Sequence, residues 1–226
     1  MMKQLREGVW QIECSGVNAY LADDDGTLTL IDAGTPRDEQ TIRAAVAEAG
    51  YALTDIERVL ITHYDVDHVG ALAALGLDAE IYIGASDRGF FIGDEKPPLG
   101  NLKGALQRVT GTVTTPPAGE VTGVADGDTV GSFTVYYTPG HTPGHVAYVS
   151  ETLSVAFVGD LVRESDGDLG PSPKPMSYDT ERVRDSIEYL ADAEPAVEVL
   201  AMGHGVPFVR NGAVRLAELG ERIARL

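Results

Sequence analysis

The chain has few cysteines and no long apolar run, and each of these shortages excludes a structural feature. Among 226 residues there is a single cysteine, Cys14, so an internal disulfide is impossible. Cys14 lies in a strand-like segment near Trp10 and Ile12, which favours a buried, inert thiol. No run of about 18 apolar residues occurs, so no membrane span is predicted. The first residues also lack the apolar segment of a secretory signal, and we expect a cytoplasmic protein.

Basic residues are scarce as well. Seventeen lysines and arginines face 35 acidic residues, which gives a formal net charge of -18. The acids are dispersed along the chain, and a solvated acidic surface of this kind repels phosphate backbones. We therefore expect neither a nucleic acid nor a membrane as partner, but a small-molecule substrate; the sequence predicts no oligomeric state. An acid-rich surface that is poor in lysine is also typical of salt-loving microbes, and we hypothesise a halophilic source.

Apolar residues make up 43% of the chain, enough for a sizeable core, and we predict a single domain over residues 1–226. Runs of strand-forming residues alternate with helical patterns, which fits an α/β layered fold with the sheets inside. The predicted strands cover residues 9–12, 18–21, 27–31, 58–61, 80–83, 133–138, 146–149, 154–158 and 197–201. The predicted helices cover residues 37–49, 69–75, the region around 183–190, and 214–226.

Two connections stand out because their patterns are weak and rich in proline. Residues 85–119 show some helical character only around 102–109, and residues 163–178 read as a loop. We expect both connections to frame a pocket. Four basic residues in them are candidate anion contacts, although solvated surface charge is the favoured interpretation of each: Arg88, Lys96, Arg163 and Lys174.

The densest chemical signal is the heptapeptide Thr62-His63-Tyr64-Asp65-Val66-Asp67-His68, which directly follows an apolar run. Strand alternation would send His63, Asp65 and Asp67 to one side, and a turn at His68 would let all four groups converge. Imidazole nitrogens and carboxylate oxygens are ligands that suit zinc, iron or manganese. The heptapeptide therefore predicts a metal site.

The other histidines fall in similar places. All five histidines of the chain lie in glycine-rich or acid-rich turns, and three further predicted strands end close to a candidate ligand. Glycines at these turns allow the backbone to bend close to an ion. The candidate residues are His141 and His145 in the run Thr138-Pro139-Gly140-His141-Thr142-Pro143-Gly144-His145, Asp160 after Gly159, and His204 after Gly203.

This ordered set of motifs, together with Asp32-Ala33-Gly34, resembles the metallo-β-lactamase-fold hydrolase superfamily over nearly the whole chain. The resemblance implies a four-layer αββα sandwich with a two-metal site along one sheet edge. It also implies roles for the candidates. His63, Asp65 and His141 would hold one metal, Asp67, His68 and His204 the other, and Asp160 would bridge them. Asp32 is expected to support the site, and His145 to stabilise its turn by hydrogen bonds.

One position departs from the family motif, His-x-His-x-Asp-His, because Asp65 stands where the second histidine is expected. In the favoured interpretation Asp65 remains a ligand, since a carboxylate oxygen reaches a metal about as well as imidazole. The alternative is a weakened first position and a site that works with one ion. A carboxylate ligand favours harder metals. The related flavodiiron proteins have a carboxylate at the position of Asp65 and bind two irons. Zinc remains the expected metal, with iron or manganese as alternatives.

The resemblance implies a hydrolase in which a metal-bridging hydroxide attacks a small ester, thioester or lactone. Asp67 and Asp160 are the candidate catalytic residues, since they would hold the ions and orient the nucleophile, and one of them could accept a proton. Two alternatives stay open. One is an iron-dependent redox enzyme of the same fold, either di-iron or like a persulfide dioxygenase. The other is a metal-binding protein with little catalysis.

Overall fold

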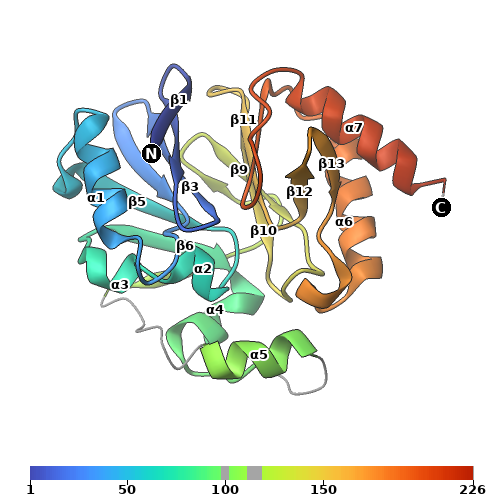
Figure 1. Ribbon diagram of the computed structural model, residues 1–226, viewed down its shortest axis with the longest axis horizontal. Coiled ribbons are helices and arrows are strands. Elements are labelled where there is room, and N and C mark those ends of the chain that lie inside the picture. The colour runs from blue at the N-terminus through green and yellow to red at the C-terminus, as the bar shows by residue number, and fades with distance from the viewer. Residues whose placement is uncertain (98–101, 111–118, 226) are drawn as a thin grey trace.

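The computed structural model describes residues 1–97, 102–110 and 119–225, and in it two β-sheets stack face to face with helices outside them (Figure 1). Within the described residues the first sheet has seven strands, in the order β1-β2-β3-β4-β5-β6-β7. Strands β1 to β4 are antiparallel neighbours, while β4 to β7 pair in parallel. The strands are β1 Met2–Arg6, β2 Val9–Glu13, β3 Asn18–Asp24, β4 Thr27–Ile31, β5 Ile56–Ile61, β6 Glu80–Gly84 and β7 Val121–Val124.

The second sheet comes from the later part of the chain and has the order β14-β11-β10-β9-β8. Its β11 and β14 pair in parallel, and a separate two-stranded hairpin lies beside it. The strands are β8 Thr129–Val130, β9 Phe133–Tyr137, β10 Val146–Ser150, β11 Val155–Gly159 and β14 Val199–Met202, and the hairpin is β12 Val162–Ser165 with β13 Asp168–Pro171.

Helices cover the outer face of each sheet, so the layers run α, β, β, α (Figure 1). On one side lie α1 and α3, on the other α6 and α7, while α5 crosses one end of the sandwich below α2 and α4. The helices are α1 Glu39–Glu48, α2 Val66–Val69, α3 Leu72–Leu75, α4 Ala85–Ile92, α5 Leu102–Thr110, α6 Thr180–Asp192 and α7 Gly212–Ile223, with 3-10 turns η1 Leu53–Asp55 and η2 Lys174–Met176. The αββα sandwich expected from the sequence is thereby confirmed.

Apolar side chains explain the layering, because each interface between layers has its own buried cluster. The cluster between the sheets includes the fully buried rings of Phe133 and Tyr148. Helix α1 buries Ile42, Ala45 and Val46 on one face against the first sheet, at the spacing that one helical stripe requires. Helix α7 buries a similar stripe against the second sheet. The sheets are therefore held rigidly enough to fix whatever lies at their ends.

The structure corrects the predicted connections. Residues 85–119 were predicted to have little regular structure, but they contain two helices, α4 and α5. Positions 98–101 and 111–118 of that range lie outside the described residues. Residues 163–178 form most of the β12–β13 hairpin and η2 instead of a loop. Hairpins and short helices escaped prediction because proline and glycine interrupt their patterns.

The His/Asp heptapeptide is also arranged differently from the expectation. Strand β5 ends at Ile61, so strand alternation does not extend through His63, Asp65 and Asp67. The chain turns at once, and α2 begins at Val66 where the prediction had a helix starting at Val69. The backbone of Asp65 is still extended, which lets the helical turn carry Asp67 and His68 back toward His63. Convergence is therefore achieved by a loop and a helical turn.

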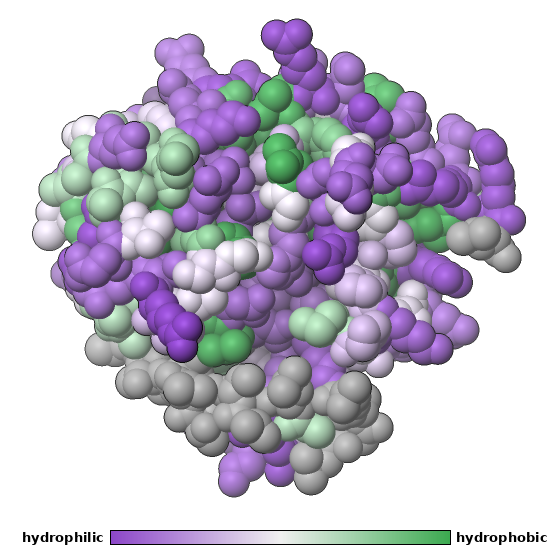
Figure 2. All heavy atoms as spheres, viewed as in Figure 1, coloured by the Kyte–Doolittle hydropathy of each residue, from purple (hydrophilic) through white to green (hydrophobic). Residues whose placement is uncertain are grey.

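The surface agrees with the composition, whereas the single thiol, Cys14, is partly buried and not fully buried as expected. Hydrophilic residues cover most of the face in Figure 2, and apolar residues appear there only as small separate patches. No helix among the described residues is long and apolar enough to cross a membrane. Burial, reinforced by the negative charge of Asp38, raises the pKa of the Cys14 thiol to about 12, so the thiol is protonated and inert at neutral pH.

Candidate metal centre

The predicted ligands come together at one end of the sandwich, each close to the end of a strand. His63 follows β5, Asp160 follows β11 directly, and His204 follows β14. His141 lies in the turn between β9 and β10. Asp67 and His68 come from α2. The first sheet and its helix thus contribute one part of the set, and the second sheet contributes the rest.

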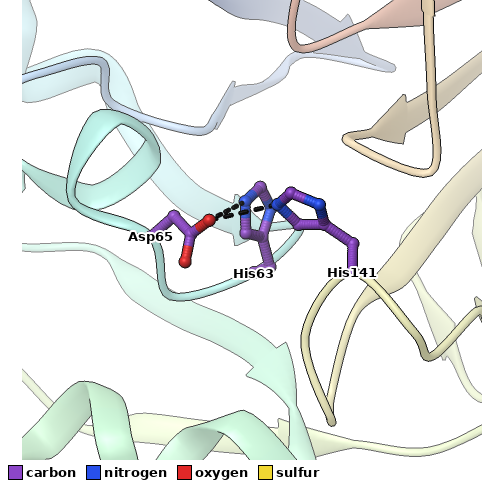
Figure 3. A group of neighbouring side chains, drawn as sticks. All are labelled: His63, Asp65 and His141. Atoms are coloured by element: carbon purple, nitrogen blue, oxygen red, sulfur yellow. Dashed lines mark hydrogen bonds and ion pairs between the residues drawn. The ribbon is translucent and has the colours of Figure 1, made fainter. Parts of the chain in front are cut away.

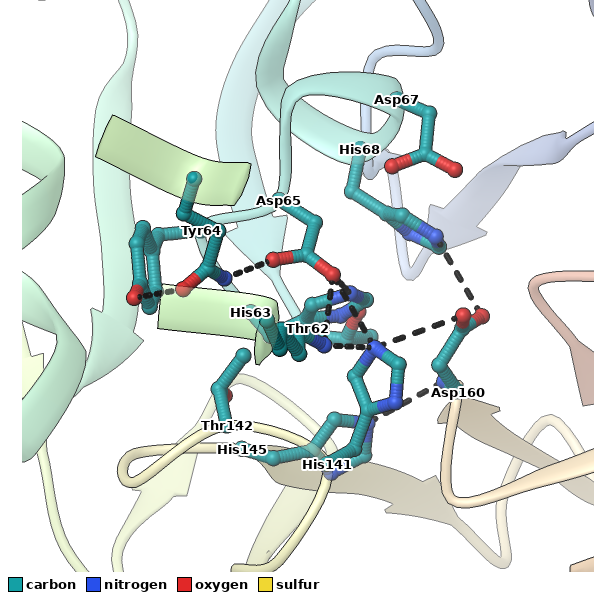
Figure 4. A network of polar contacts seen from close by, with 12 residues as sticks. Thr62, His63, Tyr64, Asp65, Asp67, His68, His141, Thr142, His145 and Asp160 are labelled. Carbon is teal, nitrogen blue, oxygen red and sulfur yellow. Dashed lines mark hydrogen bonds and ion pairs between the residues drawn. The ribbon is translucent and has the colours of Figure 1, made fainter. Parts of the chain in front are cut away.

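Their side-chain donor atoms form three overlapping groups, in each of which all atoms lie within 4.8 Å of one another. Figure 3 shows the first group, where the Asp65 carboxylate points at both imidazoles. Figure 4 shows that the Asp160 carboxylate contacts both His68 and His141. The groups are His63, Asp65 and His141; His63, His68 and Asp160; and Asp67, His68 and His204.

The spacing between donor atoms matches that of metal ligands. Ligand bonds of about 2.0–2.2 Å place the corners of a tetrahedron roughly 3.3–3.6 Å apart. In the structure, Nε2 of His204 lies 3.4 Å from Oδ2 of Asp67 and 3.3 Å from Oδ2 of Asp160. Nε2 of His68 lies 3.3 Å from Oδ1 of Asp160. These four residues, which we call the second position, fit a divalent ion.

Unpartnered polar atoms point the same way. Three buried side-chain atoms have no hydrogen-bond partner among the described residues, namely Nε2 of His63, Nε2 of His68 and Oδ1 of Asp160. A buried polar atom without a partner is costly, and three of them in one cluster indicate a site for a bound cation. Each of the three atoms can ligate a cation, His68 by exchanging the proton on Nε2 for the ion. The centre is therefore built to hold positive charge.

Supporting hydrogen bonds turn the imidazoles so that Nε2 faces the cluster. Asp32 accepts from Nδ1 of His68 at 2.8 Å and from the Thr62 hydroxyl at 2.8 Å. Because the Thr62 hydroxyl donates to Asp32, it accepts from Nδ1 of His63 at 3.0 Å. The backbone carbonyl of Gly16 accepts from Nδ1 of His204 at 2.8 Å. Asp32 thus has the supporting place that the resemblance implied, and such partners fix the tautomer of metal-binding histidines.

His145 stands outside the donor cluster, and both of its ring nitrogens are engaged by the protein. Nε2 accepts a hydrogen bond of 3.1 Å from the backbone N–H of Asp160, so Nδ1 carries the proton and donates to the Thr138 hydroxyl at 2.9 Å. The prediction of turn-stabilising hydrogen bonds is confirmed. His145 also holds the backbone of Asp160 in place.

The electrostatics favour a bound cation. Burial lowers the pKa of His63 well below its ordinary value, so this imidazole is neutral and ready to ligate. Burial also acts to lower the pKa of His68, but the carboxylates of Asp160 and Asp32 outweigh it and raise that pKa. The same carboxylates would stabilise a metal ion in place of the proton.

The structure adds two residues that sequence reasoning missed, Lys103 and Gln107 of α5. The ammonium of Lys103 lies 2.7 Å from Oδ2 of Asp65 and 2.6 Å from Nε2 of His141. The amide of Gln107 donates to the other carboxylate oxygen of Asp65. Burial acts to raise the pKa of Asp65, but Lys103 and His63 lower it well below its usual range. The donor set of His63, Asp65 and His141, which we call the first position, therefore already contacts a cationic side chain.

A cavity of about 210 Å³ opens beside the second position and is a candidate substrate pocket. Asp67, Asp160 and His204 line it together with the side of the β12–β13 hairpin. Arg163 is the one of the four predicted anion contacts that lines this cavity; Arg88 instead donates to the backbone carbonyl of Val121 at 2.7 Å. The full lining is Asp67, Asp160, Val162, Arg163, Ser172, Pro173, Met176 and His204.

Comparison with known proteins identifies the family. The sequence model of the metallo-beta-lactamase superfamily matches residues 12–204, a span that holds every predicted ligand. The chain belongs to this superfamily, as the sequence predicted.

Relatives and solved structures agree with this assignment. The chain is 30% identical to the uncharacterized protein YobT of Bacillus subtilis (strain 168), over 93% of each chain. It is 31% identical to a hydroxyacylglutathione hydrolase of Rhodopseudomonas palustris (strain BisB18), over 62% of this chain and 44% of that one. A metallo-beta-lactamase family protein of Thermus thermophilus has the same fold with a TM-score of 0.72 and 23% identity, over 98% of this chain and 81% of that one.

Proposed function

We propose that the protein is a metal-dependent hydrolase of a small ester, thioester or lactone. The observation that carries this proposal is the set of unpartnered donor atoms of His63, His68 and Asp160 converging beside a cavity. Superfamily membership supports a hydrolase-type fold, and the distant hydroxyacylglutathione hydrolase acts on a substrate of this general class by its name. The cavity volume suits a small substrate.

The chain's own residues have definable parts in such a reaction. Asp67, His68, His204 and Asp160 would hold a divalent ion, which lowers the pKa of water and polarises a substrate oxygen when bound. Burial acts to raise the pKa of Asp67, but His204 and His68 lower it below its ordinary value. Asp67 is therefore an ionised carboxylate at neutral pH that lines the cavity, in a place to accept a proton from the attacking water.

Arg163 adds a cationic side chain to the lining of the cavity. Its guanidinium can pair with a carboxylate or another anionic group of the substrate, away from the bond to be cleaved. Val162, Pro173 and Met176 supply apolar lining. We therefore infer a substrate with an acyl group, a short apolar part and an anionic end.

The test is turnover of chromogenic esters, thioesters and lactones by protein stripped with a chelator and reloaded with zinc, manganese or iron. We expect reloaded wild type to hydrolyse at least one class. His68→Ala and Asp160→Ala should lose metal and turnover together, by roughly 100-fold or more, whereas Glu48→Gln, at an exposed site of α1, should lose neither.

Two outcomes would contradict the proposal. Metal and turnover retained by both His68→Ala and Asp160→Ala would refute the site. Bound iron with oxygen-dependent turnover, and no hydrolysis of any class, would favour the redox enzyme instead. Asp65 is the reason for testing iron and oxygen, since its carboxylate suits harder metals.

A further inference from the structure

Helix α5 carries a cationic side chain into the first position. Lys103 and Gln107 lie one helical turn apart, so both reach the same carboxylate, that of Asp65. The Gln107 carbonyl oxygen also accepts from the hydroxyls of Tyr64 and Tyr178, each at 2.5 Å. These contacts hold α5 against the centre. The position of the Lys103 ammonium is therefore fixed from several sides.

Burial makes Lys103 and Asp65 a matched pair. Lys103 is only 4% exposed, and a buried ammonium is stable only when a negative group pairs with it. Asp65 supplies that charge at 2.7 Å. A histidine at position 65, as in the usual motif, would be neutral and could not supply that negative charge. The departure of Asp65 from the motif and the presence of Lys103 thus have one explanation.

The ammonium and a metal ion would compete for one lone pair on His141. Nδ1 of His141 lies 2.9 Å from the Ser172 hydroxyl, which leaves Nε2 as the ring atom that faces the centre. In the tautomer whose Nδ1 donates to the Ser172 hydroxyl, Nε2 carries the lone pair of the ring. Nζ of Lys103 lies 2.6 Å from that atom and donates to it. A divalent ion would need the same lone pair, and it would stand beside a like charge.

We propose that the Lys103 ammonium takes the place of the first metal ion, so that the protein binds a single divalent ion, at the second position. The inference rests on the proposed metal-dependent function for the ion at Asp67, His68, Asp160 and His204. Asp65 is then a partner of Lys103 and not a metal ligand, which is the one-ion alternative left open by the sequence. Helix α5 becomes part of the centre, because it delivers the charge that an ion supplies elsewhere.

The experiment counts metal ions per chain, independently of activity. Full-length protein is stripped with a chelator, equilibrated with excess zinc, passed through a desalting column and measured by mass spectrometry of the metal. Lys103→Met removes the charge and keeps an unbranched side chain that is one atom shorter. Lys3→Met is the matched control, since Lys3 is exposed on β1 at the start of the first sheet. The double variant Asp65→His/Lys103→Met restores the usual motif without a buried unpaired charge.

We expect one zinc in wild type and in Lys3→Met, and two in Lys103→Met and in the double variant. Two ions in wild type would overturn the inference. This measurement does not depend on whether the variants fold. One ion or none in folded Lys103→Met would overturn it as well, because Lys103 would then be irrelevant or a ligand itself. No ion in any form would instead refute the proposed metal-dependent function.

Discussion

Replacing Gly203 by alanine gives the sharpest test of the second position, because the added methyl group would enter it. A Cβ atom on Gly203 would lie 2.2 Å from Oδ1 of Asp160 and 2.6 Å from Cε1 of His68. The backbone of Gly203 is outside the left-handed region, so alanine meets no conformational strain. The clash therefore falls on the two residues whose donor atoms lack partners.

The size of the effect follows from these distances. Non-bonded atoms approach to about 3.5 Å, so the Asp160 oxygen must move by roughly 1 Å. Metal ligands tolerate about 0.2 Å, and a disturbed supporting shell costs roughly 10–100-fold in affinity. A 100-fold loss corresponds to about 2.7 kcal/mol of metal-dependent stabilisation. For a chain of this size that removes about 5–10 °C of the rise in melting temperature on metal addition.

The assay is thermal unfolding of stripped and zinc-saturated protein, for wild type, Gly203→Ala and Gly170→Ala. Gly170 is the matched control because no atom lies within 4 Å of its would-be Cβ and its backbone is not left-handed. The free energy of unfolding of stripped Gly203→Ala should be about 1–3 kcal/mol lower than that of stripped wild type, because of overpacking. Zinc should also raise its melting temperature less than in wild type. An equal rise on zinc addition in all three proteins would refute the placement of an ion at Asp160 and His68.

Two further predictions concern pH and salt. Burial raises the pKa of the Asp87 carboxyl from 3.8 to about 7, although the Thr142 hydroxyl and the Gly144 N–H donate to it. The folded protein therefore keeps a proton that the unfolded chain releases, so urea unfolding should show stability falling as pH rises from about 4 to 7, and Asp87→Asn should flatten that slope. Because the net charge is -18, the melting temperature should rise between low and molar salt, and an unchanged value would contradict the halophilic hypothesis.

The sequence was sufficient for the fold and for most of the donor set, since both depend on local patterns. Apolar runs marked the strands, and the residues just after them were His63, His141, Asp160 and His204. Parallel strands that end at one edge bring such residues together. The pattern failed at the heptapeptide, because nothing in it signals that β5 stops at Ile61.

Lys103 could not be found from the sequence, and the reason is physical. It lies in a segment with weak periodicity, and its partner Asp65 is far away along the chain. A lysine is ordinarily a solvated surface residue, so nothing local marks this one as buried. The only available signal was Asp65 itself, whose extra negative charge requires a counter-charge close by. The need to balance the buried charge of Asp65 is therefore a better indicator of a buried lysine than the periodicity of its helix.

The division of the donors between the two sheets has a consequence for unfolding kinetics. His68 and Asp67 belong to the first sheet's side of the centre, and Asp160 and His204 to the second. An ion bound among them would act as a removable crosslink between the halves of the sandwich. Such a crosslink would oppose separation of the two sheets, so we expect its removal to speed unfolding. Chelation should therefore shorten the protein's lifetime under protease attack.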